Sequence, residues 1–126
     1  MDDLVAEWIK FSDIDLATAK HLYETMRPIP LEIICYHCQQ SAEKILKAFL
    51  IYSGVKPART HDLEPLRKEC VKIDKTFNEI TEKCARLSDY SSQPRYPMEI
   101  VITDEDTRLA LQDSKEISEF VKGKTC

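Results

Sequence analysis

Residues 35–54, CYHCQQSAEKILKAFLIYSG, allow two interpretations that lead to different folds. Cys35 and Cys38 form a C-x-x-C motif, a spacing that occurs in zinc sites and in redox enzymes. The residues that follow have the apolar spacing of one long amphipathic helix. The first interpretation makes the chain a metal or thiol-disulfide protein. The second makes it a helical protein with two buried thiols.

The apolar spacing favours the helix, which we expect to run from about Pro30 to Tyr52. At about 100° per residue, one stripe contains both cysteines of the motif; its members are Ile34, Cys35, Cys38, Ala42, Ile45, Leu46, Phe49, Leu50 and Tyr52. A redox C-x-x-C lies between a strand and a helix N-terminus, whereas no strand precedes Cys35. A mid-helix pair also supplies at most two of the four ligands that zinc takes. We therefore expect the cysteines to pack in the core, with no metal site and no cofactor.

The rest of the chain predicts further helices, because turn residues are scarce and glycine occurs only at Gly54 and Gly123. Prolines and Ser53–Pro57 separate helical segments expected at about 3–26, 30–52, 60–73, 75–91 and 103–122. Gly54 is placed to end the second segment and Thr103 to cap the last. No strong breaker lies at Ile73-Asp74-Lys75, so the third and fourth segments are either separate helices or one bent helix.

These segments indicate an all-α fold, an antiparallel up-and-down bundle of four to five helices in a single domain, residues 1–126. In the first segment the apolar residues follow helical steps: Leu4, Val5, Trp8, Phe11, Leu16, Ala19, Leu22, Tyr23 and Met26. In the last, Leu109, Ala110, Ile117, Phe120 and Val121 are expected to face inward.

Composition and charge exclude several classes of protein. The net charge of -4 is unlike the basic balance of a non-specific duplex-binding protein. No stretch approaches the roughly 20 apolar residues of a membrane span. The acidic N-terminus, MDDLVAEWIK, lacks the features of a secretory signal. We therefore expect a cytoplasmic protein whose five cysteines are reduced.

Four sequence blocks together resemble the HEPN family, whose small helical domains occur beside, or fused to, minimal nucleotidyltransferases in prokaryotes. The blocks are Trp8 with Asp15-Leu16, CYHCQQSAEKILKAFL at 35–50, THDLEPL at 60–66 and YSSQPRYP at 90–97. The resemblance covers residues 8–121. It implies an up-and-down bundle that forms a homodimer, with a groove at the dimer interface suited to nucleotide or RNA.

Many members of the family are metal-independent ribonucleases, with activity associated with an arginine followed a few residues later by a histidine. Arg86 lies in the corresponding region, but residues 87–93 contain no histidine, and His21, His37 and His61 all lie upstream. RNA cleavage needs a group that accepts a proton from the 2′-hydroxyl. We therefore expect no catalytic residues and a likeness to the branch of the family without nuclease activity.

The resemblance then implies nucleotide binding. Arg95 is suited to hold a phosphate, and Tyr90 or Tyr96 to stack on a base or ribose. Basic residues on the polar face of the second helix are expected to line the same groove. The candidate nucleotide-binding residues are His37, Lys44, Lys47, Tyr90, Arg95 and Tyr96.

Structural roles remain open for the same residues. Lys44 and Lys47 fit a solvated face with Glu43 nearby, and Arg95 with Tyr96 can fix a loop against the bundle. His37 fits equally well in a dimer interface. Two further contacts are expected to be structural: Arg86 with Glu82, one helical turn away, and His61 at the N-terminus of the third helix.

Our leading hypothesis is a non-catalytic module that pairs with a nucleotidyltransferase and binds nucleotide in a dimer groove, within a toxin–antitoxin or nucleotide-transfer system. One alternative is a metal-independent ribonuclease that uses His37 or His61 with Arg86 or Arg95. Another is a structural bundle whose apolar arc on the second helix buries a helix of a partner protein.

Overall fold

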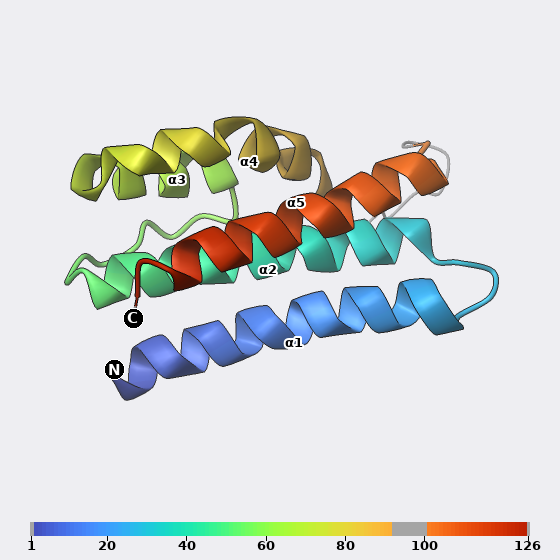
Figure 1. The fold of residues 1–126 in the computed structure, drawn as a ribbon, viewed down its shortest axis with the longest axis horizontal. Coiled ribbons are helices and arrows are strands. Elements are labelled where there is room, and N and C mark those ends of the chain that lie inside the picture. Colours follow the sequence, from blue (N-terminus) through green and yellow to red (C-terminus); the bar gives the residue numbers. More distant parts are fainter. Residues whose placement is uncertain (1, 92–100, 126) are drawn as a thin grey trace.

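The computed structural model describes residues 2–91 and 101–125, and the regular structure in these two ranges is entirely helical (Figure 1). The prediction of an all-α bundle is confirmed. The five α-helices are α1 (Asp3–Thr25), α2 (Leu31–Tyr52), α3 (Leu63–Ile73), α4 (Thr81–Leu87) and α5 (Asp104–Lys122). Two 3₁₀ helices, η1 (Lys75–Ile80) and η2 (Ser88–Tyr90), flank α4.

Helix α2 lies at the centre of the bundle. It contacts α1, α3, α4 and α5, and in Figure 1 α1 lies along one side of it while α3 and α4 lie along the other. Its central place follows from its apolar stripe, which is broad enough to face several neighbours at once. Within the described ranges, no helix is long and apolar enough to cross a membrane.

The helix ends follow the expected capping chemistry. Gly54 has φ of 81°, the left-handed conformation that ends α2, and Val55 N–H donates to the Leu50 carbonyl at 2.8 Å. At α5, the Thr103 hydroxyl accepts from Asp106 N–H and the Asp106 carboxylate accepts from Thr103 N–H, each at 3.0 Å. This capping box sets the start of α5.

The third and fourth helical segments are separate. Asp74 ends α3 in an extended conformation, with φ of −144° and ψ of 108°. Its carboxylate accepts hydrogen bonds from Thr76, from the backbone N–H at 3.0 Å and from the hydroxyl at 2.6 Å. These bonds lower the pKa of Asp74. The break is thus made by a capping aspartate, not by the glycine or proline that usually marks one.

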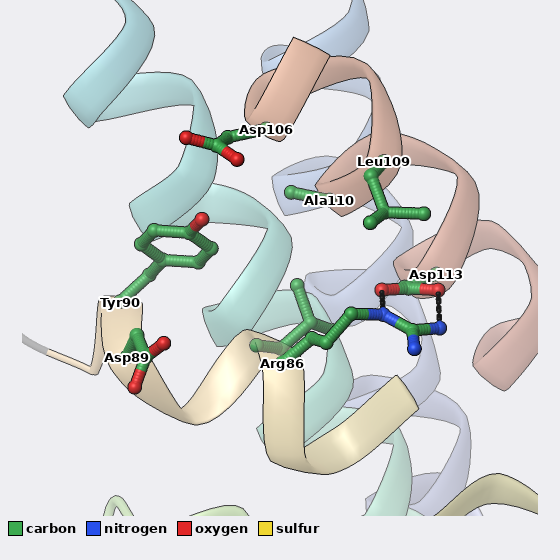
Figure 2. Close-up of a pocket in the computed structure, with 8 residues that line it drawn as sticks. Arg86, Asp89, Tyr90, Asp106, Leu109, Ala110 and Asp113 are labelled. Carbon is green, nitrogen blue, oxygen red and sulfur yellow. Dashed lines mark hydrogen bonds and ion pairs between the residues drawn. The ribbon is translucent and has the colours of Figure 1, made fainter. Parts of the chain in front are cut away.

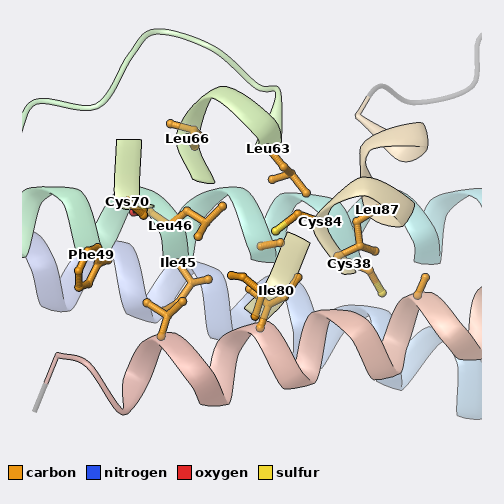
Figure 3. Packing of buried hydrophobic residues seen from close by; sticks show 14 of the residues in the cluster. Cys38, Ile45, Leu46, Phe49, Leu63, Leu66, Cys70, Ile80, Cys84 and Leu87 are labelled. Atoms are coloured by element: carbon orange, nitrogen blue, oxygen red, sulfur yellow. The ribbon is translucent and has the colours of Figure 1, made fainter. Parts of the chain in front are cut away.

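The cysteines of α2 pack in the core, as predicted. Cys35 and Cys38 are fully buried, and Cys70 from α3 and Cys84 from α4 join the same cluster (Figure 3). Burial raises the pKa of Cys35 to about 11 and those of Cys70 and Cys84 to about 12. These thiols therefore stay protonated near neutral pH. No three His, Cys, Asp or Glu side chains of the described residues come together as metal ligands.

The buried thiols should make the fold sensitive to alkali. The pKa of a cysteine in the unfolded chain is about 8.5, so above that pH the unfolded chain releases protons that the folded chain keeps. Stability is then fully present below about pH 8.5 and declines as pH rises toward the raised pKa values. Urea titrations at increasing pH should show a falling free energy of unfolding, and a shallower decline in Cys84→Ala. A wild-type stability that is constant up to pH 10 would contradict this expectation.

Several apolar residues expected to face inward are exposed instead. In α1, Leu4 is 52% and Phe11 45% exposed, and in α5, Leu109 is 44% exposed. The core side of α1 carries polar residues in their place, since Ser12 and Asp15 are buried between Val5 and Ala19. Polar groups can occupy the core face because α2 supplies partners for them, as described below.

Candidate nucleotide-binding site

Tyr90 lies in a pocket between the end of α4 and the first half of α5 (Figure 2). The cavity has a volume of about 160 Å³. The 3₁₀ helix η2 places Tyr90 and Asp89 on one side, and α5 supplies the other. The lining residues are Arg86, Leu87, Asp89, Tyr90, Asp106, Leu109, Ala110 and Asp113.

Arg86 is held in this pocket by Asp113 of α5. Its Nε and Nη2 atoms donate to the two carboxylate oxygens, each at 2.8 Å (Figure 2). The Asp113 side chain is only 3% exposed, so it depends on this bidentate partner. The hydrogen bonds to Asp113 raise the pKa of Arg86. Arg86 therefore pairs across helices and not with Glu82 as predicted, because the buried carboxylate gains more from the guanidinium than an exposed one.

The pocket carries more negative than positive charge. Asp89 and Asp106 lie in the lining beside the neutralised Arg86–Asp113 pair. Burial, followed by neighbouring acidic groups including Asp106, raises the pKa of Tyr90 to about 12. Tyr90 is therefore a hydrogen-bond donor at neutral pH. Carboxylates accept hydrogen bonds from hydroxyl groups, so the pocket suits a ribose better than a phosphate.

The predicted partners Arg95 and Tyr96 lie outside the described residues, in the segment that follows Tyr90. None of the three histidines, which are all in the described part of the chain, lines the pocket. The pocket thus holds Arg86 without a histidine beside it.

His37 and Lys44 of α2 converge on one carboxylate of α1. Asp15 accepts from His37 Nδ1 at 3.0 Å and from Lys44 Nζ at 2.5 Å. The Asp15 side chain is 11% exposed, and beside it the hydroxyls of Ser12 and Ser41 join the two helices. Lys44 therefore neutralises a carboxylate at the α1–α2 contact, and His37 hydrogen-bonds to the same carboxylate.

Lys47 and His61 both contact a second carboxylate, that of Glu43 in α2. Glu43 accepts from Lys47 Nζ at 2.9 Å and lies 3.2 Å from His61 Nδ1. The Lys47 ammonium also lies 5.6 Å from the centre of the Trp8 ring. His61 does not cap α3 as predicted; the nearby side-chain bond is from Asp62 N–H to the Thr60 hydroxyl. Glu43 therefore fastens the α2–α3 loop to the middle of α2.

The four candidate residues that the structure describes do not form one groove. His37 and Lys44 contact α1, Lys47 contacts Glu43 within α2, and Tyr90 lines a pocket with α5. Sequence reasoning placed Glu43 near the two lysines but missed the contacts made by three other acids: Asp15, Asp106 and Asp113. A usable signal existed for two of them, since Asp15 and Asp113 occupy helical steps on otherwise buried stripes.

Comparison with known proteins gives a consistent result. The family model described as "HEPN domain" matches residues 5–124. The crystal structure of an archaeal HEPN homologue superposes with a TM-score of 0.75, at 23% sequence identity, over 97% of this chain and 98% of that one. At this identity the structural likeness concerns the fold. A search of curated proteins finds no match.

Proposed function

Because this chain belongs to the HEPN domain family, we propose that it is a non-catalytic helical module that pairs with a nucleotidyltransferase and binds a nucleotide beside Tyr90. The observation that carries this proposal is the set of side chains that surround Arg86. Its guanidinium is bound to the buried Asp113, and no histidine lines the pocket with it. The arginine–histidine pair that the family's ribonucleases use is therefore not assembled there, which favours binding over cleavage.

The pocket chemistry suggests how a nucleotide binds. Its sugar hydroxyls donate to Asp89 or Asp106, and the Tyr90 ring offers a surface for the base or ribose. Arg95 follows in the chain and supplies a positive charge for phosphate, which the acidic pocket itself does not supply. Lys44 and Lys47 contribute less, since carboxylates already neutralise them.

A thermal shift assay with a panel of nucleoside mono-, di- and triphosphates tests the binding. A nucleotide present at about 100 times its Kd stabilises the fold by about 2.7 kcal/mol, so the melting temperature should rise by several degrees. Arg95→Ala should abolish the shift, while Arg59→Ala, at an exposed position in the α2–α3 loop, should leave it intact. No shift with any nucleotide would reject the nucleotide part of the proposal.

Two further assays separate the alternatives. Co-expression with a minimal nucleotidyltransferase encoded next to this chain should yield a complex that survives gel filtration. Incubation with single-stranded RNA and a chelator should give no cleavage. Metal-independent cleavage that His37→Ala or His61→Ala abolishes would establish the ribonuclease instead.

A further inference from the structure

Helices α1 and α5 form the two sides of an open groove. The helices run in opposite directions, since the two chain ends lie at the same end of the bundle (Figure 1). Tyr23 contacts Asp104 towards one end of the pair, and Asp13 contacts Lys122 towards the other. The groove has a volume of about 550 Å³. Its lining residues, which define the α1–α5 groove, are Leu16, Lys20, Tyr23, Glu24, Arg108, Leu111, Gln112 and Lys115.

The α1–α5 groove is separate from the pocket at Tyr90, and the two share no lining residue. In α5 the pocket uses Asp106, Leu109, Ala110 and Asp113, whereas the groove uses positions 108, 111, 112 and 115. At about 100° per residue, these two sets lie on nearly opposite sides of the helix. A ligand in the groove therefore leaves the pocket at Tyr90 open.

Part of the groove lining is apolar. Leu16, Tyr23 and Leu111 are half-buried, and Tyr23 and Leu111 also pack against the core. The Tyr23 hydroxyl donates to Asp104 at 2.8 Å, which fixes the ring in place. Along α5 the groove extends over residues 108–115, about 10 Å at 1.5 Å per residue. This length matches two turns of a helix.

Basic side chains flank the apolar part from both helices. Lys20 comes from α1, and Arg108 and Lys115 come from α5, seven positions apart and therefore in line along the helix. Glu24 is the one acid in the lining. The groove is thus positive, although the whole chain has a net charge of -4.

These cations are open to a further partner. Lys115 is exposed and has no hydrogen bond or ion pair with any residue that the structure describes. Lys20 has only a 4.0 Å contact with Glu24, and its side chain is 76% exposed. Arg108 Nε lies 3.0 Å from Asp104 Oδ2, but the arginine side chain is 64% exposed. Exposed pairs of this kind contribute little to stability, so an incoming acid competes with them at small cost.

We propose that the α1–α5 groove binds an amphipathic helix of another protein that carries acidic residues on both flanks of its apolar stripe. Helices dock in this way by placing apolar residues at helical spacing into a groove between two helices. Leu16, Tyr23 and Leu111 receive the apolar stripe. Two acids seven positions apart in the docked helix then reach Arg108 and Lys115, as flanking charges do in coiled coils.

The arrangement of charges favours this occupant over others. A small anion contacts one or two of the three cations and leaves the apolar part exposed. A nucleic-acid strand supplies phosphates but no continuous apolar stripe. An acidic amphipathic helix matches both the apolar part and the cations that flank it. Glu24 further predicts a neutral or basic residue at its end of the docked helix.

Fluorescence anisotropy tests the charge complementarity. The probe is a fluorescein-labelled peptide of three heptads, with leucine at positions a and d and glutamate at e and g, and the control peptide carries lysine at e and g. The acidic peptide should bind with a Kd in the micromolar range, and more weakly as salt is added. Because the chain has a net charge of -4, general attraction would favour the lysine peptide instead. Absence of binding by the acidic peptide, or tighter binding of the lysine peptide, would overturn the proposal.

Charge reversal locates the binding. The double variant Lys20→Glu with Lys115→Glu should weaken binding of the acidic peptide about tenfold or more, and the lysine peptide should gain affinity. The matched control is Arg59→Glu with Lys68→Glu, which changes the net charge equally at exposed positions in the α2–α3 loop and α3, across α2 from α1 (Figure 1). It should leave the affinity nearly unchanged. Equal losses in both double variants would place the peptide elsewhere and refute the groove.

Two further probes exclude the other occupants. Vesicles that contain phosphatidylserine and single-stranded RNA should each bind no more weakly to the Lys20→Glu, Lys115→Glu variant than to the wild type. Binding of either probe that this variant abolishes, without binding of the acidic peptide, would assign the groove to a membrane or to RNA. The peptide assay uses no nucleotide, so this proposal and nucleotide binding at Tyr90 succeed or fail separately.

Discussion

Replacing Phe77 with alanine should lower the free energy of unfolding by about 3–5 kcal/mol. Phe77 is fully buried in η1, where it joins α2 and α5 to the smaller helices. Its ring centre lies 4.5 Å from that of Phe49 and 5.1 Å from that of Phe120, which it meets edge to face. The substitution removes these ring contacts and leaves a cavity that the surrounding helices cannot fill completely.

Urea denaturation followed by circular dichroism measures this loss. Phe77→Leu should cost clearly less, because much of the volume remains. The matched control is Phe11→Ala, since Phe11 is 45% exposed and its removal should change stability by no more than about 1 kcal/mol. Equal losses for Phe77→Ala and Phe11→Ala would show that Phe77 is not a core residue.

Replacing Glu43 with alanine should cost about 3 kcal/mol, because it leaves a largely buried ammonium without its carboxylate. The Lys47 side chain is 12% exposed and loses its 2.9 Å ion pair. The contact with Trp8 compensates only in part. His61 loses little, since its side chain is 77% exposed and its carbonyl still accepts a hydrogen bond from Gln39 Nε2 of α2 at 2.7 Å.

The double variant Glu43→Met with Lys47→Met separates the ion pair from simple packing. Two apolar side chains of similar length leave no uncompensated charge, so this variant should be much more stable than Glu43→Ala. Glu43→Gln should fall between the two, because the amide oxygen still accepts a hydrogen bond. If the double variant is as unstable as Glu43→Ala, the loss does not come from the unpaired Lys47, because the double variant has no charge left at either position.

Local chemistry explains which features were predictable. The Gly54 terminus, the Thr103 cap and the burial of Cys35 and Cys38 depend on neighbours within a few positions, and all three were predicted correctly. For Arg86 and His61 we predicted contacts with residues close by in the chain, and both predictions were wrong. Each finds a buried carboxylate 27 or 18 positions away in the chain.

The six candidate residues illustrate the same limit at the site. Residue type alone suggested that His37, Lys44 and Lys47 serve a ligand, but Asp15 and Glu43 already bind them. Periodicity places a side chain on a helix face without saying which acids the neighbouring helix presents to it. The same limit applies to the pocket at Tyr90, since Asp106 and Asp113 reach it only once α5 packs beside α4.

The sequence by itself determined the helical fold, the ends of α2 and α5, the buried thiols and membership of the HEPN domain family. These follow from periodicity, capping and ordered motifs, which are properties of adjacent residues. Only the tertiary structure decided which charges neutralise one another and that Arg86 lies beside Asp113 and Tyr90. The physical reason is that ion pairing and burial depend on distances between helices, and packing sets those distances.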